Sequence, residues 1–259
     1  GKTICSWYDA ERKGQLIDTQ TSYALPLAFH VVDGDLQKKM AAHLAAAIKT
    51  PMAGYPAYSL LTGFIGTAWI SKALSDNGMS EEAYRLLQYE GYPSWLYPVK
   101  NGATTIWERL NSYTVKDGFG ENNSMNSFNH YSFGAVASWM YNYSLGICRD
   151  EKSPGFKHFI LKPEVDPTRG ITHAEGYYDS MYGRISSRWQ YTDSGIRYEF
   201  TVPANTTASL YLPAPAVSFI SENGKPLKKA SGVRYVSADK ELHHLELASG
   251  SYQFDIKQK

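Results

Sequence analysis

The residues best suited to chemistry lie between positions 91 and 131. Glu108 stands between Trp107 and Arg109, and a carboxylate in such a place can give or take a proton. His130 follows an asparagine and precedes a tyrosine, and its imidazole can donate or accept a hydrogen bond. The stretch between these two motifs is rich in Asn, Gly and Ser, which is the composition of a loop. Polar side chains on such a loop can hydrogen-bond the hydroxyls of a sugar.

Each of these candidates has a structural alternative. Glu108 can be a surface carboxylate paired with Arg109 or Lys100, and His130 can be a structural histidine at the start of an apolar helix. The chain carries 20 Tyr, 10 Phe and 6 Trp, 14% of its 259 residues. Such rings either fill a core or cover the apolar faces of sugars, and both interpretations stay open for Trp95 and Trp107.

Composition excludes several other classes of function. With 26 Lys+Arg against 25 Asp+Glu, the chain lacks the basic surplus that nucleic-acid binding needs. No apolar run is long enough to predict a membrane-spanning helix. The two cysteines, Cys5 and Cys148, are too few for a disulfide framework and lack the spacing of metal ligands. No phosphate-binding loop or nucleophile elbow is present, so we expect neither a metal nor a cofactor.

The first part of the chain, from Asp18 to about Ile147, has helical periodicity. One apolar stripe predicts a helix from the spacing of Leu36, Met40, Leu44, Ala47 and Ile48. A second stripe lies in 59–74 and consists of Leu60, Leu61, Phe64, Ile65, Ala68 and Trp69. Ser75-Asp76-Asn77-Gly78 predicts a turn, Ser80 begins the next helix, and a further helix is expected from near Asn126 to Leu145. This pattern predicts a series of helical hairpins.

After Gly155 the period changes to two, which indicates strands. Alternating apolar residues predict one strand over 196–202 and another over 252–256. The segments 192–195 and Asn223-Gly224 predict tight turns. Six to eight short strands would form an antiparallel β-sandwich. We therefore expect an α + β chain of two domains, with residues 1–150 helical and residues 151–259 the sandwich.

Several motifs resemble the bacterial α-L-rhamnosidases of glycoside hydrolase family seventy-eight. The resemblance covers nearly the whole chain. Its residues in the helical half are Thr104-Thr105-Ile106-Trp107-Glu108-Arg109 and Met125-Asn126-Ser127-Phe128-Asn129-His130-Tyr131-Ser132-Phe133-Gly134-Ala135-Val136. Its residues in the β half are Gly155-Phe156-Lys157-His158-Phe159, Tyr178-Asp179-Ser180-Met181-Tyr182-Gly183-Arg184-Ile185 and Val202-Pro203-Ala204-Asn205-Thr206-Thr207-Ala208.

The resemblance implies an (α/α)6 barrel that hydrolyses terminal α-L-rhamnose with inversion, using one carboxylate as acid and another as base. The glutamate of the Trp-Glu-Arg motif corresponds to the general base, which is Glu108. The histidine of the Asn-His-Tyr motif lines the sugar site in the family, which makes His130 a substrate-binding candidate. Trp107 and Trp95 are weaker candidates for packing against the sugar.

One feature departs from the family pattern. The family's general acid lies in an upstream acidic motif that this chain lacks, and about 150 helical residues supply only part of a twelve-helix barrel. We expect the C-terminal part of a barrel followed by the terminal sandwich, inactive as an isolated chain. Its exposed helix faces would bind the missing N-terminal half of the barrel or cause self-association. If an acid lies within the chain, Asp9, Glu11, Asp18 and Glu121 are the residues to test.

Two other functions remain open. The chain can be a non-catalytic carbohydrate-binding or structural module, with Trp189, Tyr177, Tyr178 and Tyr182 as a sugar platform on the sandwich. It can also belong to a barrel glycosidase of different sugar specificity. The family favours a periplasmic or extracellular location, although the sequence itself does not assign a compartment.

Overall fold

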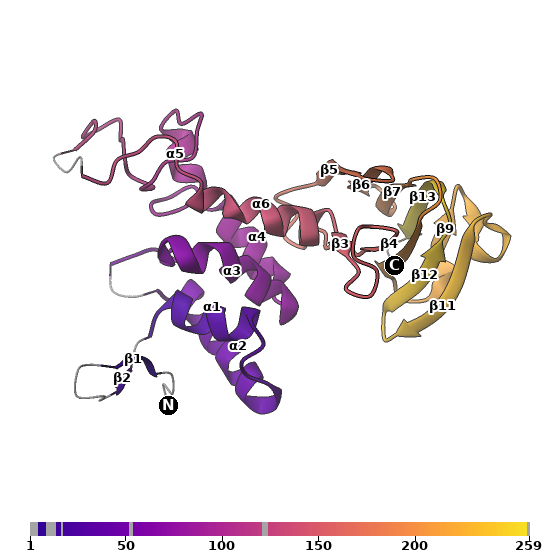
Figure 1. Cartoon of the computed structure of the whole chain (residues 1–259), viewed down its shortest axis with the longest axis horizontal. Helices are drawn as coiled ribbons and strands as arrows, with labels where there is room; N and C mark the ends of the chain where they lie inside the picture. The colour runs from indigo at the N-terminus through magenta and orange to yellow at the C-terminus, as the bar shows by residue number, and fades with distance from the viewer. Residues whose placement is uncertain (1–4, 9–13, 17, 52–53, 121–123, 258–259) are drawn as a thin grey trace. The chain divides into compact units, whose positions relative to one another are not determined.

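A computed structural model describes residues 5–8, 14–16, 18–51, 54–120 and 124–257. The chain divides into two compact units, a helical unit of Gly1–Ser138 and a sandwich unit of Trp139–Lys259. Figure 1 shows helices along the first part of the chain and strands along the second.

The helical unit is built on helix α1, which packs against α2 and α3, while α3 also packs against α4 and η1. A short antiparallel hairpin of β1 and β2 precedes them. The elements are β1 (Cys5–Tyr8), β2 (Gly14–Leu16), α1 (Gln20–Ala28), α2 (Gly34–Lys49), α3 (Gly63–Asp76), α4 (Ser80–Gln88), α5 (Leu96–Lys100), the 3₁₀ turn η1 (Ser132–Ala135) and α6 (Val136–Trp139).

Local capping explains where α1 begins. Thr19 and Ser22 form a capping box, in which the Thr19 hydroxyl accepts from the Ser22 amide and the Ser22 hydroxyl accepts from the Thr19 amide. The buried Gln20 amide then donates to the Ser59 carbonyl at 2.8 Å and accepts from the Leu61 amide at 2.8 Å. A single polar side chain thus fixes the segment that leads into α3.

The predicted helix faces are partly correct. In α2, Met40, Leu44 and Ile48 are buried as expected, whereas Leu36 is 48% exposed. The stripe predicted for 59–74 is wrong in register, because α3 begins only at Gly63 and Ile65 is 70% exposed. The buried face of α3 consists instead of Gly66, Thr67, Ile70, Ser71, Ala73, Leu74 and Ser75.

A glycine explains this shift of the buried face. A Cβ atom at Gly66 would lie only 2.1 Å from the Thr21 hydroxyl of α1. Only glycine therefore permits the close approach of α1 and α3. The Thr67 hydroxyl is satisfied locally, since it donates to the Gly63 carbonyl and pairs with the Thr62 hydroxyl. Gly66 and the locally bonded Thr67 thus belong to a helix contact that a count of apolar residues misses.

The helix expected from Asn126 to Leu145 is shorter at its start. Helical structure begins at Ser132 with η1, continues through α6, and ends in a π-helical turn, η2 (Met140–Ser144). Residues 126–131 are loop. The helical segment ends close to Leu145, as expected, and Gly146 follows it: the φ of Gly146 is 69°, which is left-handed, and a Cβ there would lie 2.1 Å from the Pro163 nitrogen.

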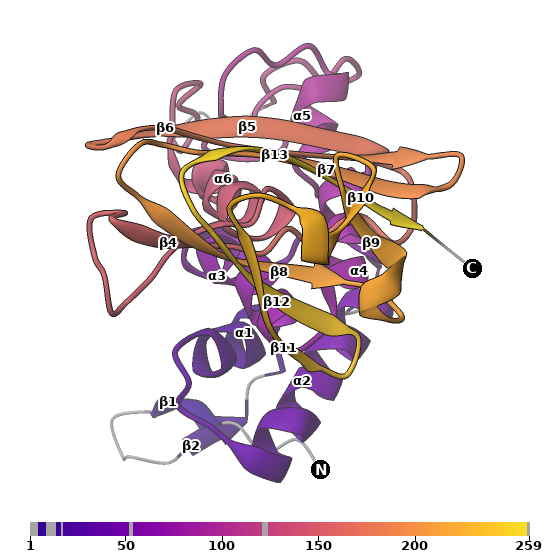
Figure 2. The ribbon, with the colours of Figure 1, turned by 90° about the vertical axis from the view of Figure 1, so that its right-hand side faces the viewer.

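The sandwich unit contains two sheets that face each other as separate layers (Figure 2). The six-stranded sheet has the order β10-β9-β13-β7-β6-β5 and the five-stranded sheet the order β11-β12-β8-β4-β3. The strand pairs described in these two sheets are antiparallel, except for β4 with β8, which is parallel. The described residues thus form eleven strands here, more than the six to eight expected. The strands are β3 (Ile147–Arg149), β4 (His158–Leu161), β5 (His173–Ser180), β6 (Gly183–Thr192), β7 (Gly195–Val202), β8 (Thr207–Pro213), β9 (Ile220–Glu222), β10 (Lys225–Pro226), β11 (Val233–Asp239), β12 (Leu242–Leu247) and β13 (Gly250–Lys257), with the turns η3 (Val217–Phe219) and η4 (Leu227–Lys229).

Strict alternation places the core of this unit where the sequence predicts it. Ile196, Tyr198, Phe200 and Val202 are all buried along β7, as are the alternating apolar residues of β13. The hairpin between β6 and β7 closes through Asp193 and Ser194 as expected. Trp189 is fully buried and donates its indole N–H to the Ser144 carbonyl at 2.8 Å. It therefore belongs to the core, and its expected place on an exposed sugar platform is wrong.

Candidate active site

Two loop segments of the helical unit lie side by side and carry the predicted catalytic residues. The Glu108 amide donates to the Ser127 carbonyl at 2.9 Å, and the His130 amide donates to the Ile106 carbonyl at 2.8 Å. The Thr105 hydroxyl also donates to the Phe128 carbonyl. These bonds bring the Trp-Glu-Arg motif and the Asn-His-Tyr motif together across a loop of some twenty residues.

The carboxylate of Glu108 is held at one oxygen. Its Oε2 atom accepts a hydrogen bond from the Ser127 amide at 2.9 Å, whereas Oε1 has no protein partner among the described residues. The side chain is half-buried. This geometry holds the carboxyl group in place through Oε2 and leaves Oε1 available to a ligand or a water molecule.

A surface ion pair does not account for Glu108. Within the described part of the chain Glu108 forms no ion pair. Lys100, one of its two expected partners, pairs instead with Glu90 at 3.0 Å. The other, Arg109, donates from Nη2 to the Asn126 side-chain oxygen at 3.3 Å. Arg109 thereby adds a further link between the two motifs.

His130 is oriented through one ring nitrogen. Its Nδ1 accepts from the Ser132 amide at 3.3 Å, so the neutral ring carries its proton on Nε2. Among the described residues Nε2 has no partner. The ring stacks on Phe64 of α3, with centroids 4.8 Å apart, and on Tyr131 at 5.5 Å. His130 therefore presents a single N–H donor in a fixed direction.

Both tryptophans lie within the packing of these loops. Trp107 is 6% exposed and makes an edge-to-face contact with Phe128, with centroids 5.3 Å apart. Trp95 is 9% exposed and donates its indole N–H to the Phe133 carbonyl at 2.8 Å. In the described structure both rings support the backbone that carries Glu108 and His130.

Of the four alternative acids, Asp18 lies within the described residues. Asp9, Glu11 and Glu121 lie outside the described residues. Asp18 accepts a hydrogen bond from the Tyr23 hydroxyl of α1. Burial, and next the hydrogen bond to Asp18, raise the pKa of Tyr23 to about 12. This hydrogen bond ties Asp18 to α1.

Two contributors to this site were not predicted from the sequence. Ser127 lies inside a recognised motif, but it binds Glu108 through its backbone N–H and carbonyl, and its residue type carries no signal of that. Phe64 is separated from His130 by more than sixty positions and was assigned to an apolar stripe.

In the described part of the chain no group of three or more His, Cys, Asp or Glu side chains could hold a metal ion. None of the helices described is long and apolar enough to cross a membrane.

Comparison with known proteins assigns both units to one kind of protein. Residues 5–144 match the family described as bacterial alpha-L-rhamnosidase 6 hairpin glycosidase domain. Residues 146–226 match the bacterial alpha-L-rhamnosidase C-terminal domain. The first match alone covers more than half of the chain.

Curated and structural relatives agree with this match. An alpha-L-rhamnosidase of Streptomyces avermitilis is 35% identical over 96% of this chain, and one of Alteromonas sp. is 34% identical over 92%. The chain spans only 22% and 24% of their respective lengths. The crystal structure of the Streptomyces avermitilis alpha-L-rhamnosidase complexed with L-rhamnose superimposes with a TM-score of 0.82 and 33% identity, over 97% of this chain and 23% of that one. The structure of alpha-L-rhamnosidase from Dictyoglumus thermophilum superimposes with a TM-score of 0.77 and 27% identity, over 93% of this chain and 25% of that one.

Proposed function

The chain belongs to the bacterial α-L-rhamnosidase six-hairpin glycosidase family, and on that premise we propose that it is the C-terminal part of an inverting α-L-rhamnosidase. The substrate is a glycoside or oligosaccharide that ends in α-L-rhamnose. The barrel portion lies within residues 1–150, and residues 151–259 lie within the sandwich domain, which β3 joins through its pairing with β4. The remaining hairpins of the barrel are the partner of the helical unit.

Glu108 is the general base of this reaction. The observation that carries the assignment is its asymmetric carboxylate, with Oε2 held by the Ser127 amide and Oε1 without a protein partner among the described residues. Oε1 takes a proton from a water molecule as the water oxygen bonds to the anomeric carbon. The glycosidic bond breaks at the same time, and its electrons leave with the aglycone oxygen. A carboxylic acid outside the paired loops must protonate that oxygen, and we place it upstream of this chain.

His130 binds the substrate in this proposal. A ring that accepts at Nδ1 and donates at Nε2 can donate one hydrogen bond to a sugar oxygen. The stack on Phe64 fixes the plane of the ring, so little rotational freedom is lost when the sugar binds. Trp107 and Trp95 shape the site by holding the two loop segments in place.

The decisive experiment uses the longer protein that contains this segment. Glu108→Gln keeps the size of the side chain but removes the base, so kcat for an aryl α-L-rhamnoside should fall by roughly 10²- to 10⁴-fold. The circular dichroism and thermal unfolding of the variant should match the wild type. A Gln variant that keeps most of its turnover would overturn the assignment. The 259-residue chain alone should be silent, because it lacks the acid.

A matched pair at Ser127 tests how Glu108 is positioned. Ser127→Pro removes the N–H that binds Oε2, and the loss of a hydrogen bond to a charged group should lower kcat by roughly tenfold or more. Ser127→Ala keeps that N–H and should retain kcat within a factor of about three. Equal effects of the two substitutions, at unchanged thermal stability, would show that the amide does not position the base.

A further inference from the structure

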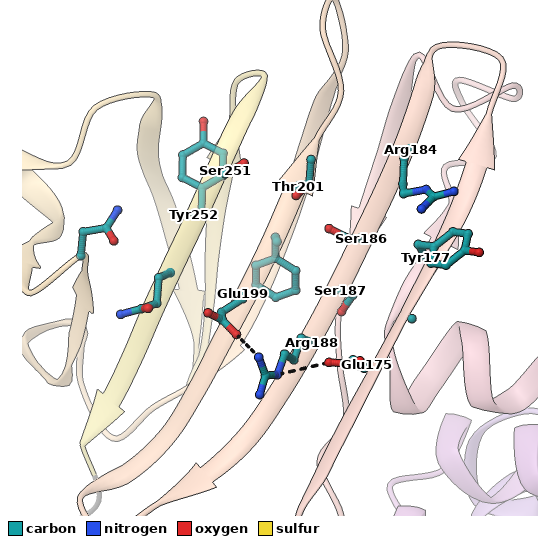
Figure 3. A pocket seen from close by; sticks show the side chains of 14 residues that line it. Glu175, Tyr177, Arg184, Ser186, Ser187, Arg188, Glu199, Thr201, Ser251 and Tyr252 are labelled. Carbon is teal, nitrogen blue, oxygen red and sulfur yellow. Dashed lines mark ion pairs between the residues drawn. The ribbon is translucent and has the colours of Figure 1, made fainter.

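The outer face of the six-stranded sheet is hollowed into a groove of about 620 Å³. It crosses β5, β6, β7 and β13, and Figure 3 shows the side chains that line it. We call it the sheet groove, and define it by two rows of side chains that run across the strands. The first row consists of Tyr177, Ser186, Thr201 and Ser251, and the second of Glu175, Arg188, Glu199 and Gln253.

The first row is a line of hydroxyl groups. Strand register places Tyr177 opposite Ser186, Ser186 opposite Thr201, and Thr201 opposite Ser251. Neighbouring strands lie about 4.8 Å apart, so the row spans about 14 Å. Among the described residues, the hydroxyls of Ser186, Thr201 and Ser251 have no protein hydrogen-bond partner. Three unpaired hydroxyls therefore line one path along the groove.

The second row contains one guanidinium group and two carboxylates. Arg188 lies between two carboxylates, 3.2 Å from Glu199 and 3.6 Å from Glu175, as the dashed lines in Figure 3 indicate. It also donates from Nη2 to the Gln190 side-chain oxygen at 2.9 Å. Arg184 lies at the end of the groove, so the lining contains two arginines and two glutamates. The lining has no net charge, and its cations already have anionic partners.

An aromatic ring closes one end of the groove. Tyr177 is 49% exposed, and the Arg184 guanidinium lies 3.6 Å from the centre of its ring. Asp179 holds that guanidinium through two hydrogen bonds, at 2.7 and 3.0 Å. The ring is thus fixed in place and still offers apolar surface beside the row of hydroxyls (Figure 3).

We propose that the sheet groove is a second, non-catalytic binding site for a neutral oligosaccharide. Each sugar hydroxyl both donates and accepts, so it can bind the unpaired hydroxyls and the paired charged groups without displacing any ion pair. An anionic ligand would have to compete with Glu175, Glu199 and Asp179 for the arginines. An extended peptide lying across the groove would gain no strand pairing from β6, β7 or β13, because each of these strands is already paired on both sides.

The size and lining of the groove fit this class of ligand. Its volume lies within the range of about 300 to 1,000 Å³ that small-molecule sites occupy. A ring face at one end and a polar path beyond it match the apolar and hydroxyl-bearing faces of linked sugars. The assignment does not depend on Glu108 or on turnover, and only the choice of a rhamnose probe rests on the proposed function.

Binding of a neutral rhamnotriose to the 259-residue chain, measured by isothermal titration calorimetry, tests the site. Tyr177→Ala should weaken binding at least about tenfold, and the isosteric Thr201→Val by roughly three- to tenfold, as expected for one lost hydrogen bond. Tyr178→Ala is the matched control. Tyr178 is the next residue on β5, is 42% exposed and points to the opposite face, so its loss should leave affinity unchanged. Thermal unfolding of each variant checks that the fold is intact.

Defined outcomes overturn the proposal. The absence of saturable binding does so, and so does binding that survives Tyr177→Ala but is lost with His130→Ala, which would locate the sugar in the helical unit. Tighter binding of a trigalacturonate than of rhamnotriose would refute the preference for neutral ligands. Binding of maltotriose that also depends on Tyr177 would support the neutral class. None of these results depends on the loss of turnover in Glu108→Gln, so the two proposals can fail separately.

Discussion

The two units of the chain differ in how much of their apolar side chains is exposed. In the sandwich unit Ile185, Trp189 and Phe254 are fully buried between the sheets. In the helical unit Val31 is 73% exposed and Ile65 is 70% exposed. Exposed apolar side chains on this scale mark surfaces that another layer of structure can cover. Both units have a buried apolar core, and Met181 of the sandwich unit is also 83% exposed, but more of the exposed large apolar residues described lie in the helical unit. This difference agrees with our proposal that further helical hairpins cover the helical unit.

The candidate chemistry lies in the helical unit. Glu108 and His130 stand on loop segments that only a few hydrogen bonds and ring contacts hold together. The sheet groove, by contrast, is built on paired strands whose register fixes each lining residue. The geometry of the candidate active site therefore depends on local loop contacts, whereas that of the proposed second site depends on the sheet itself.

The largest expected effect tests the closed core of the sandwich. Ile185→Ala should lower the free energy of unfolding of that unit by about 3 kcal/mol, because it leaves a cavity between the sheets. Hydrogen exchange followed by mass spectrometry monitors the two units separately. Peptides from β6 and β7 should exchange roughly a hundredfold faster, and peptides from α3 at the wild-type rate. Acceleration of both sets alike would show that the two cores are not independent.

Alkaline pH should produce a smaller effect, in the helical unit. Folding raises the pKa of Tyr23 from 10.0 to about 12, mainly through burial and then through the hydrogen bond to Asp18. A raised tyrosine pKa stabilises the fold fully below pH 10, and this contribution is lost as the pH rises toward 12. Wild type should therefore lose about 1 kcal/mol more stability than Tyr23→Phe between pH 9 and pH 11.

Urea unfolding followed by circular dichroism at the two pH values measures this difference. The other buried tyrosines are present in both proteins, so their titration cancels in the comparison. Equal losses in wild type and in Tyr23→Phe would contradict the assignment of the raised pKa to Tyr23.

The smallest effect is expected from another isoleucine-to-alanine substitution, this time at Ile65 in the helical unit. Ile65→Ala removes a side chain that is 70% exposed, and should change the stability of this chain by less than about 0.5 kcal/mol. In the longer protein the same substitution should cost more, if further hairpins cover this face. Thermal unfolding of both forms decides the point, and an equal, negligible cost in both would show that Ile65 stays exposed.

Sequence patterns predicted the strands better than the helices, and particular residues show why. Along β7 every second residue from Ile196 to Val202 is buried, as strict alternation requires. Along α3 the contact face includes Gly66 and Thr67, which no count of apolar residues selects. Several faces of a helix can be buried against a neighbour, and the close approach of α1 at Gly66 determines which face of α3 is buried. The extra strands of the sandwich are short segments such as β9 and β10, which are too brief for a periodic signal.

By itself the sequence determined the family, the order of helical and sandwich units, and the residues that we propose carry the chemistry, because motif residues and periodicity are local properties of the chain. Only the tertiary structure decided which atoms act on them. The Ser127 amide binds Glu108, Phe64 stacks on His130, and strand register aligns Tyr177, Ser186, Thr201 and Ser251 into one row. Such contacts join residues far apart in the chain and depend on backbone position, which residue type does not encode.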